Sequence, residues 1–132
     1  LSKNCNLYSV NESGDKKVYT LNANGMIKET LYLGHKISEH FYDEESNLVR
    51  AVFLFEGKIL SKNEVTYADS HDRPLDYKIK NSAINSSGFI ATNSCKYSEQ
   101  LVPELCQLTV QNTDSPPPGP IKMTVSTKVE FY

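Results

Sequence analysis

The chain has 132 residues, of which 23% are charged, and its formal net charge at pH 7 is −2. This length predicts a single domain over residues 1–132 with a buried core. The charged residues form no basic stripe of the kind that binds nucleic acid. No apolar run approaches the roughly 18 residues of a membrane-spanning helix, so we expect neither a nucleic acid partner nor a membrane span.

Residues 17–80 contain a repeat. They follow a polar start in which alternation at Leu7–Val10 predicts a short strand. The residue pairs Tyr19/Tyr42, Asn24/Asn47, Gly34/Gly57 and Ser38/Ser61 are each 23 residues apart. Each copy has an aromatic residue, a polar turn, an apolar run, a glycine turn and a second apolar run, which is typical of β-hairpins. We expect strands at Val18–Leu21, Met26–Leu33, Ile37–Tyr42, Leu48–Phe55, Lys58–Tyr67 and Leu75–Lys80.

Two features of this region stand out. Asn24-Gly25 is the strongest signal for a tight hairpin, because a primed turn needs two residues that tolerate positive φ. The strand predicted at Leu48–Phe55 carries apolar residues on both faces. We expect it to be either buried on both sides or half buried, with an aromatic ridge containing Phe53 and Phe55 exposed.

Residues 81–120 are predicted to be rich in loops. Asn81–Gly88 has loop composition throughout, and Phe89–Thr92 predicts a short strand at most. Ser98–Leu105 is the one helix candidate, which Pro103 limits to about one turn. A strand is expected at Leu105–Val110, and the prolines between Asp114 and Pro120 predict a stiff polyproline spacer, with a proline-motif ligand as the alternative.

Residues 121–132 show the clearest alternation in the chain. Apolar and polar side chains alternate from Ile121 to Tyr132, with Thr127 as the break on the apolar side. This pattern predicts an antiparallel strand with one face exposed to water. Together the segments predict an all-β domain, an antiparallel meander curling into a barrel or a two-layer sandwich with at most one short helical turn.

The three cysteines are Cys5, Cys95 and Cys106. The favoured pairing is a Cys95–Cys106 disulfide that closes a short loop, and the alternatives are a bond from Cys5 to one of these two or three reduced thiols. A disulfide indicates a periplasmic or secreted protein. The chain does not begin with Met, which fits either removal of a signal peptide or a trimmed sequence.

No pattern in the sequence indicates catalysis. A serine or cysteine nucleophile needs a base within reach, and no local motif supplies one. His35, His40 and His71 lie in turns or mid-strand without the spacing of a metal site. We therefore expect no enzymatic activity, no metal and no cofactor.

Part of the repeat resembles known families. The segments Tyr42–Arg50 and Glu56–Lys58 look like one unit of the YD (Rhs-like) repeats, and they are similar to the MORN-like repeats of bacterial antitoxin-type proteins. The resemblance covers about residues 19–79. It implies a β-meander in a bacterial protein that binds a partner, and it carries over no catalytic residue.

These observations favour a non-catalytic binding protein that inhibits or neutralises a protein partner, as an immunity protein does with a toxin or a hydrolase. The alternatives are a small-ligand carrier with a β-barrel cavity and a structural or adhesive surface module. An acidic turn and a second polar turn are positioned to block a basic or metal-bearing site on a partner, and aromatic residues are expected beside them. The predicted contact residues are Tyr32, Tyr42, Asp43, Glu44, Glu45, Phe53, Phe55, Tyr67, Asp69, His71 and Asp72.

Overall fold

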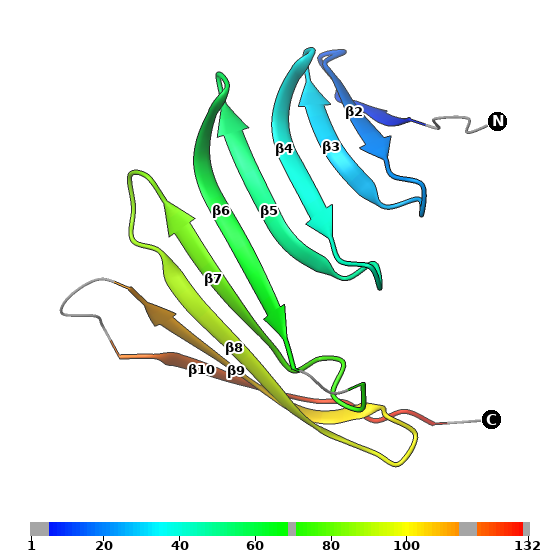
Figure 1. Ribbon diagram of the computed structural model, residues 1–132, viewed down its shortest axis with the longest axis vertical. Coiled ribbons are helices and arrows are strands. Elements are labelled where there is room, and N and C mark those ends of the chain that lie inside the picture. The colour runs from blue at the N-terminus through cyan, green and yellow to red at the C-terminus, as the bar shows by residue number, and fades with distance from the viewer. Residues whose placement is uncertain (1–5, 69–70, 114–118, 131–132) are drawn as a thin grey trace. The chain divides into compact units, whose positions relative to one another are not determined.

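The computed structural model describes residues 6–68, 71–113 and 119–130, which form ten β-strands and, in these ranges, no helix (Figure 1). Cys5, Asp69 and most of the proline segment lie outside the described residues. The strands are β1 (Leu7–Val10), β2 (Lys16–Leu21), β3 (Ile27–Tyr32), β4 (His35–Tyr42), β5 (Leu48–Phe55), β6 (Lys58–Tyr67), β7 (Tyr77–Ala83), β8 (Phe89–Tyr97), β9 (Pro103–Asn112) and β10 (Ile121–Ser126).

The strands form one antiparallel meander in which neighbours in sequence are neighbours in the sheet, from β1 to β10. The predicted all-β antiparallel fold is confirmed. The predicted barrel is not found in the described part of the chain, because β1 and β10 lie at the two ends of the strand order and do not pair with each other. No helix among the described residues is long and apolar enough to cross a membrane.

The chain divides into two compact units. The first comprises the described residues up to Asn63 together with Ala83–Asn85, so it contains β1 to β5 and the first part of β6. The second comprises Glu64–Ser82 and the described residues from Ser86 onward, which include most of β7 and all of β8 to β10.

One type of five-residue loop recurs between strands. In each copy the first residue accepts a backbone hydrogen bond from the fourth residue and donates one to the fifth. Its side chain also accepts hydrogen bonds from backbone N–H groups within the loop, the local bonding for which Asn, Asp and Ser are favoured. The fourth residue has positive φ. The loops begin at Asn11, Asn22, Asp43 and Ser98.

The tightest turns are Leu33-Gly34 and Glu56-Gly57, where both residues have positive φ, from 49° to 81°. They lie 23 residues apart, as the repeat in the sequence requires. The tight turn predicted at Asn24-Gly25 is wrong: only Gly25 has positive φ there, and Asn22 organises a longer loop. Asn22 and Asp43 are therefore equivalent in structure, whereas the sequence repeat aligned Asn24 with Asn47.

The core of the first unit lies at the middle of β5. Ala51 and Val52 are each 4% exposed although they point to opposite faces, while Phe53 and Phe55 near the end of the strand are exposed. Both expectations for this strand are therefore met, in different parts of it. The core also buries the hydroxyl-bearing Thr30 and Ser38, which lie opposite each other on β3 and β4.

The core of the second unit lies on one face of β7, β8 and β9. Ala91 and Cys95 are 5% and 3% exposed, and their cross-strand neighbours on β9 are Val110 and Cys106. The predicted disulfide joins Cys95 to Cys106, which are directly opposite in the β8–β9 register.

Four predictions between residues 77 and 132 are corrected. The segment expected to be a loop contains the end of β7, and β8 runs from Phe89 to Tyr97 instead of stopping near Thr92. Pairing on both sides stabilises these polar strands, so tertiary context overrides their low strand propensity. Ser98–Leu105 contains a tight loop and the start of β9, with no helical turn. The last strand ends at Ser126, earlier than predicted.

Candidate partner-binding surface

Four exposed apolar side chains of the first unit share one face of the sheet. The two-residue turn Glu56-Gly57 places Phe53 opposite Leu60, because a two-residue hairpin loop fixes the register. The Ile84 N–H donates to the Leu60 carbonyl at 3.1 Å, so Ile84 lies opposite Leu60 on the other side. Phe55 follows Phe53 on the same face by the two-residue period of a strand. We call these four residues the apolar patch.

The exposure of the apolar patch is high for large side chains. Phe53 and Leu60 are each 40% exposed, Phe55 is 61% and Ile84 is 63% exposed. Scattered apolar residues are normal on a protein surface, but a contiguous group indicates an interaction site. Glu56 and Lys58 border the patch as exposed charged residues, which gives it the polar rim around an apolar centre found in protein interfaces.

The sequence identified half of this patch. Phe53 and Phe55 were predicted as contact residues, whereas Leu60 and Ile84 were not. The Glu56-Gly57 turn contained the information needed to place Leu60 opposite Phe53. Ile84 had no comparable signal, because it lies in a segment of loop composition and only its pairing with β6 brings it to the patch.

The two predicted tyrosines of the first unit are held by hydrogen bonds. Tyr32 donates from its hydroxyl to an Asp15 carboxylate oxygen at 3.0 Å, and this bond is the main cause of the raised pKa of Tyr32. Tyr42 donates to the Ile27 carbonyl at 2.7 Å, and burial raises its pKa. Tyr32 lies on the same side as Phe53, since the register aligns Thr30, Ser38 and Phe53 across β3, β4 and β5.

The predicted acidic turn has two different parts. Asp43 stabilises the loop itself, because its carboxylate accepts hydrogen bonds from the N–H groups of Glu45 and Asn47 at 3.0 and 2.8 Å. The Asn47 hydrogen bond is the largest influence on Asp43 and lowers the pKa of its carboxyl. Glu44 and Glu45 are exposed and are the members of this turn available to a partner.

The remaining predicted contact residues belong to the second unit. Tyr67 is half-buried on β6, whereas His71 and Asp72 are exposed in the following turn. Asp69 lies outside the described residues. The predicted set is therefore divided between the two units, and the apolar patch belongs to the first unit alone.

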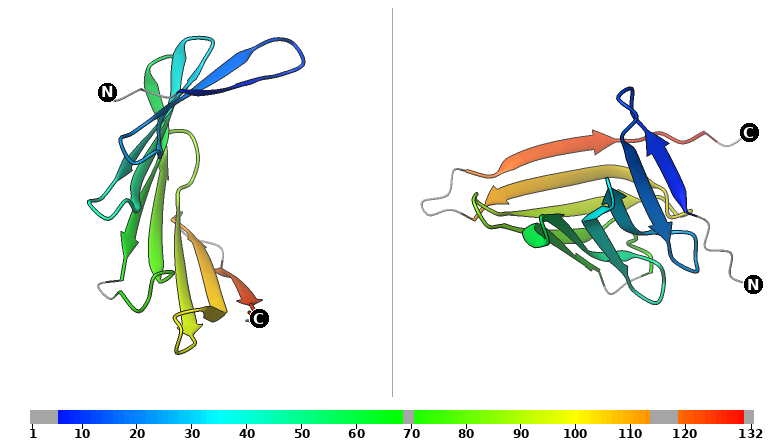
Figure 2. Two further views of the ribbon diagram at one scale, coloured as in Figure 1. Left: turned by 90° about the vertical axis from the view of Figure 1, so that its right-hand side faces the viewer. Right: turned by 90° about the horizontal axis from the view of Figure 1, so that it is seen from above.

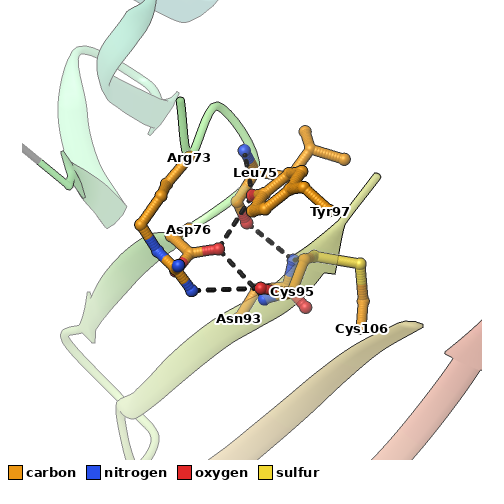
Figure 3. A network of polar contacts seen from close by, with 7 residues as sticks. All are labelled: Arg73, Leu75, Asp76, Asn93, Cys95, Tyr97 and Cys106. Carbon is orange, nitrogen blue, oxygen red and sulfur yellow. Dashed lines mark hydrogen bonds and ion pairs between the residues drawn. A yellow bond between two sulfur atoms is a disulfide. The ribbon is translucent and has the colours of Figure 1, made fainter. Parts of the chain in front are cut away.

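The turn before β7 contains a polar network that no sequence motif indicated (Figure 3). The Asp76 carboxylate accepts from the Arg73 Nε at 2.7 Å, from the Tyr97 hydroxyl at 2.8 Å and from the Cys95 N–H at 3.0 Å. Arg73 also donates to the Cys95 carbonyl at 3.0 Å, and Leu75 donates its N–H to the Tyr97 hydroxyl at 2.9 Å. The network fixes the turn onto the strand that carries the disulfide.

The charge of Asp76 is stabilised by this network. Burial by itself raises the pKa of the carboxyl, but the hydrogen bonds from Tyr97, Cys95 and Arg73 outweigh it and the pKa is lowered. The side chain of Asp76 is 14% exposed. Because the carboxylate bonds the Arg73, Tyr97 and Cys95 groups of its own chain, the network stabilises the fold of the second unit.

Two other features could carry chemistry. His40 has a buried Nδ1 without a hydrogen-bond partner, and burial lowers its pKa. A surface pocket of about 490 Å³ in the first unit is lined by Ser9, Val10, Asn11, Asp15, Lys17, Tyr32 and Ile37. Within the residues that the structure describes, no group of three or more His, Cys, Asp or Glu side chains is arranged to hold a metal ion.

The fold places this chain among the all-β proteins built on an antiparallel sheet. A family model matches residues 1–132, and the chain belongs to the uncharacterised protein family UPF0257. No curated protein and no solved structure is significantly similar to it.

Proposed function

We propose that this chain is a non-catalytic, extracytoplasmic protein-binding module whose apolar patch holds a protein partner. The observation that carries the proposal is the contiguous exposure of Phe53, Phe55, Leu60 and Ile84 on one face of the first unit. Full burial of a large apolar side chain contributes roughly 1.5–3 kcal/mol, and these four side chains are still 40% to 63% exposed. A partner that covers the patch recovers part of this free energy.

The chemistry of the patch indicates the kind of partner. Phe53 and Phe55 project large rigid rings, which serve as anchors in protein interfaces when a complementary pocket surrounds them. The charged rim and the exposed Glu44 and Glu45 of the same unit favour a partner with apolar pockets and basic surroundings. An inhibitory role, in which the module occludes the active site of a toxin or a hydrolase, fits these features.

The disulfide supports a location outside the cytoplasm. Cys95 and Cys106 are bonded across two paired strands, and structural disulfides persist in oxidising compartments such as the periplasm or the extracellular space. We therefore propose a periplasmic or secreted protein.

The experiment is a comparative capture. The immobilised wild-type chain, a Phe53→Ser/Phe55→Ser variant and a Leu7→Ser control are exposed to an extracytoplasmic extract of the source organism. Leu7 is a suitable control because it is also exposed, at 56%, but lies on β1. Far-UV circular dichroism first establishes that all three are folded.

We expect one stoichiometric protein to bind the wild type and the Leu7→Ser control but not the double variant. The purified chain should then inhibit the activity of the captured protein. Equal capture by all three forms would reject the patch as the binding site, and capture without inhibition would reject the inhibitory role.

The pocket in the first unit supports a second candidate, a carrier of a small ligand. Its lining combines the apolar Val10 and Ile37 with the polar Ser9, Asn11 and Lys17, a mixture common in ligand sites. Native mass spectrometry of the protein purified from its source organism tests this function. A retained small molecule that is lost in an Ile37→Trp variant would favour the carrier over the protein-binding module.

A further inference from the structure

The backbone of β10 has an open edge. In the described part of the chain, β10 has a strand neighbour only on its β9 side. Just beyond β10, the Thr127 N–H donates to the Glu104 carbonyl at 2.8 Å, which continues the β9–β10 register. Hydrogen-bonded and non-hydrogen-bonded pairs alternate along an antiparallel ladder. The N–H and C=O groups of Lys122, Thr124 and Ser126 therefore point away from β9, toward the open edge.

The apolar side of the same strand is uncovered. Ile121, Met123 and Val125 lie opposite Val110, Leu108 and Cys106 of β9 in the sheet. This face is buried on β8, where Ala91 is 5% exposed, but on β10 the exposure of these three residues is 65%, 50% and 59%. The ribbon shows β10 beside β9 (Figures 1 and 2). Outward-pointing backbone groups and exposed apolar side chains therefore occur together on β10, a combination that favours the addition of another strand.

The charged residues between Lys122 and Glu130 indicate which strand can pair with the open edge of β10. From Lys122 to Glu130 every even-numbered residue is polar, and the charged ones are Lys122, Lys128 and Glu130. Lys128 and Glu130 form an ion pair at 3.2 Å, with side chains 85% and 56% exposed, so they project on the same side into solvent. A second copy running antiparallel and centred on Ser126 places Lys122 opposite Glu130 of the other copy, twice by symmetry.

We propose that the segment Lys122–Glu130, which comprises most of β10 and the four residues after it, pairs with the same segment of a second copy of this chain, antiparallel and centred on Ser126, to join two sheets into one. In this register Met123 faces Val129 and Thr124 faces Lys128, so the apolar side chains of the two copies continue on one face. The even-numbered residues face each other, as the outward direction of their backbone groups requires. This symmetric contact is of the closed, two-fold type.

Neighbouring registers are less favourable. A pairing centred on Val125 places Lys122 opposite Lys128 of the other copy, and like charges directly opposite are destabilising. A pairing centred on Thr124 places Lys122 opposite Ser126 and leaves Glu130 without an opposite residue in β10 of the other copy. Of these three pairings, the one centred on Ser126 joins opposite charges, so electrostatics as well as the apolar pattern favours this register over its two neighbours.

Sedimentation equilibrium of the 132-residue chain tests the proposal. We expect a particle of twice the 14.9 kDa chain mass at concentrations of tens of micromolar. Lys122→Glu and Glu130→Lys each replace two attractive pairs with repulsive ones and should weaken dimerisation about tenfold. The double variant Lys122→Glu/Glu130→Lys restores opposite charges and should return dimerisation to the wild-type level.

A backbone variant provides an independent test. Thr124→Pro removes an N–H that points to the open edge, so the β9 pairing should remain while the dimer is lost. Thr124→Ala, which retains the N–H, is the matched control and should still form dimers. Circular dichroism establishes that both variants are folded.

Three results would overturn the proposal: a monomer at several hundred micromolar, a dimer insensitive to Thr124→Pro, or a double charge variant as weak as the single ones. The last two would assign the contact to a different surface or register. This proposal does not depend on the partner-binding function. The Phe53→Ser/Phe55→Ser variant should dimerise normally, and the Thr124→Pro variant should still capture the partner.

Discussion

The carboxylate of Asp76 accepts a hydrogen bond from the backbone N–H of Cys95 at 3.0 Å, although the two residues are 19 positions apart in the chain. This bond attaches the turn before β7 to the strand that carries the disulfide. Arg73 strengthens this attachment, because its guanidinium donates hydrogen bonds to both the Asp76 carboxylate and the Cys95 carbonyl. The stability of the second unit should therefore depend strongly on this one side chain.

Replacing Asp76 should destabilise the protein. In Asp76→Ala the N–H of Cys95, the hydroxyl of Tyr97 and the Nε of Arg73 all lose their acceptor, and we expect a loss of about 2 kcal/mol in the free energy of unfolding. Urea unfolding followed by circular dichroism measures the loss. Glu99→Gln is the control, since Glu99 is exposed in a nearby turn, and a loss equal to that of the control would contradict the importance of the network.

The same carboxylate predicts sensitivity to acid. The folded-state pKa of Asp76 is lowered, below an unfolded value of about 3.9, so the unfolded chain binds more protons between these two pKa values. The stabilisation is fully present above the unfolded pKa and is lost as pH falls through the folded pKa. Urea midpoints measured below pH 4 should fall less steeply in Asp76→Asn than in the wild type. Parallel curves would show that the charge of Asp76 contributes nothing.

His40 predicts a second pH effect in a different range. Burial lowers its pKa, so below the unfolded value of about 6.5 the unfolded chain takes up a proton before the folded chain does. Stability should decline as pH falls from about 6.5 toward the folded pKa, because protonation favours the unfolded state. In His40→Gln this decline should disappear. An NMR titration of His40 showing a pKa at or above 6.5 would contradict the burial argument.

Loss of the disulfide should also be costly. Cys95 and Cys106 close a loop with a sequence separation of 11, and the double variant Cys95→Ala/Cys106→Ala should lose roughly 2–3 kcal/mol. Reduction of the wild type should lower its unfolding temperature, whereas the reductant should not affect the variant. A variant as stable as the oxidised wild type would show that pairing with the neighbouring strands is sufficient.

The tight turn at Glu56-Gly57 offers a stabilising change. Glu56 has φ of 49°, a left-handed conformation in which Asn is less strained than Glu. Glu56→Asn should raise the free energy of unfolding by about 0.5 kcal/mol, and Gly57→Ala should lower it by about 1 kcal/mol. Thermal unfolding measures both changes. Glu44→Asn, at a loop position without positive φ, is the control, and equal effects of the two Asn variants would contradict the turn argument.

Local sequence patterns determined the fold class and much of its detail. The 23-residue spacing of Gly34 and Gly57 located two tight turns, because glycine is favoured where φ is positive, and alternation over residues 121–126 located the last strand. The spacing of Cys95 and Cys106 indicated their disulfide. Apolar residues on both faces of the strand at Leu48–Phe55 predicted either a strand buried on both sides or an exposed aromatic ridge containing Phe53 and Phe55.

Only the tertiary structure decided the rest. The extent of β7 and β8 depends on pairing from both sides, which stabilises polar segments that have little strand propensity of their own. Three residues gain their roles from partners that are distant in sequence. Asp76 accepts from the N–H of Cys95, Ile84 donates to the carbonyl of Leu60, and Thr127 donates to the carbonyl of Glu104. These contacts depend on how strands align across the sheet, and strand alignment is set by the sum of many weak pairings that no single stretch of sequence contains.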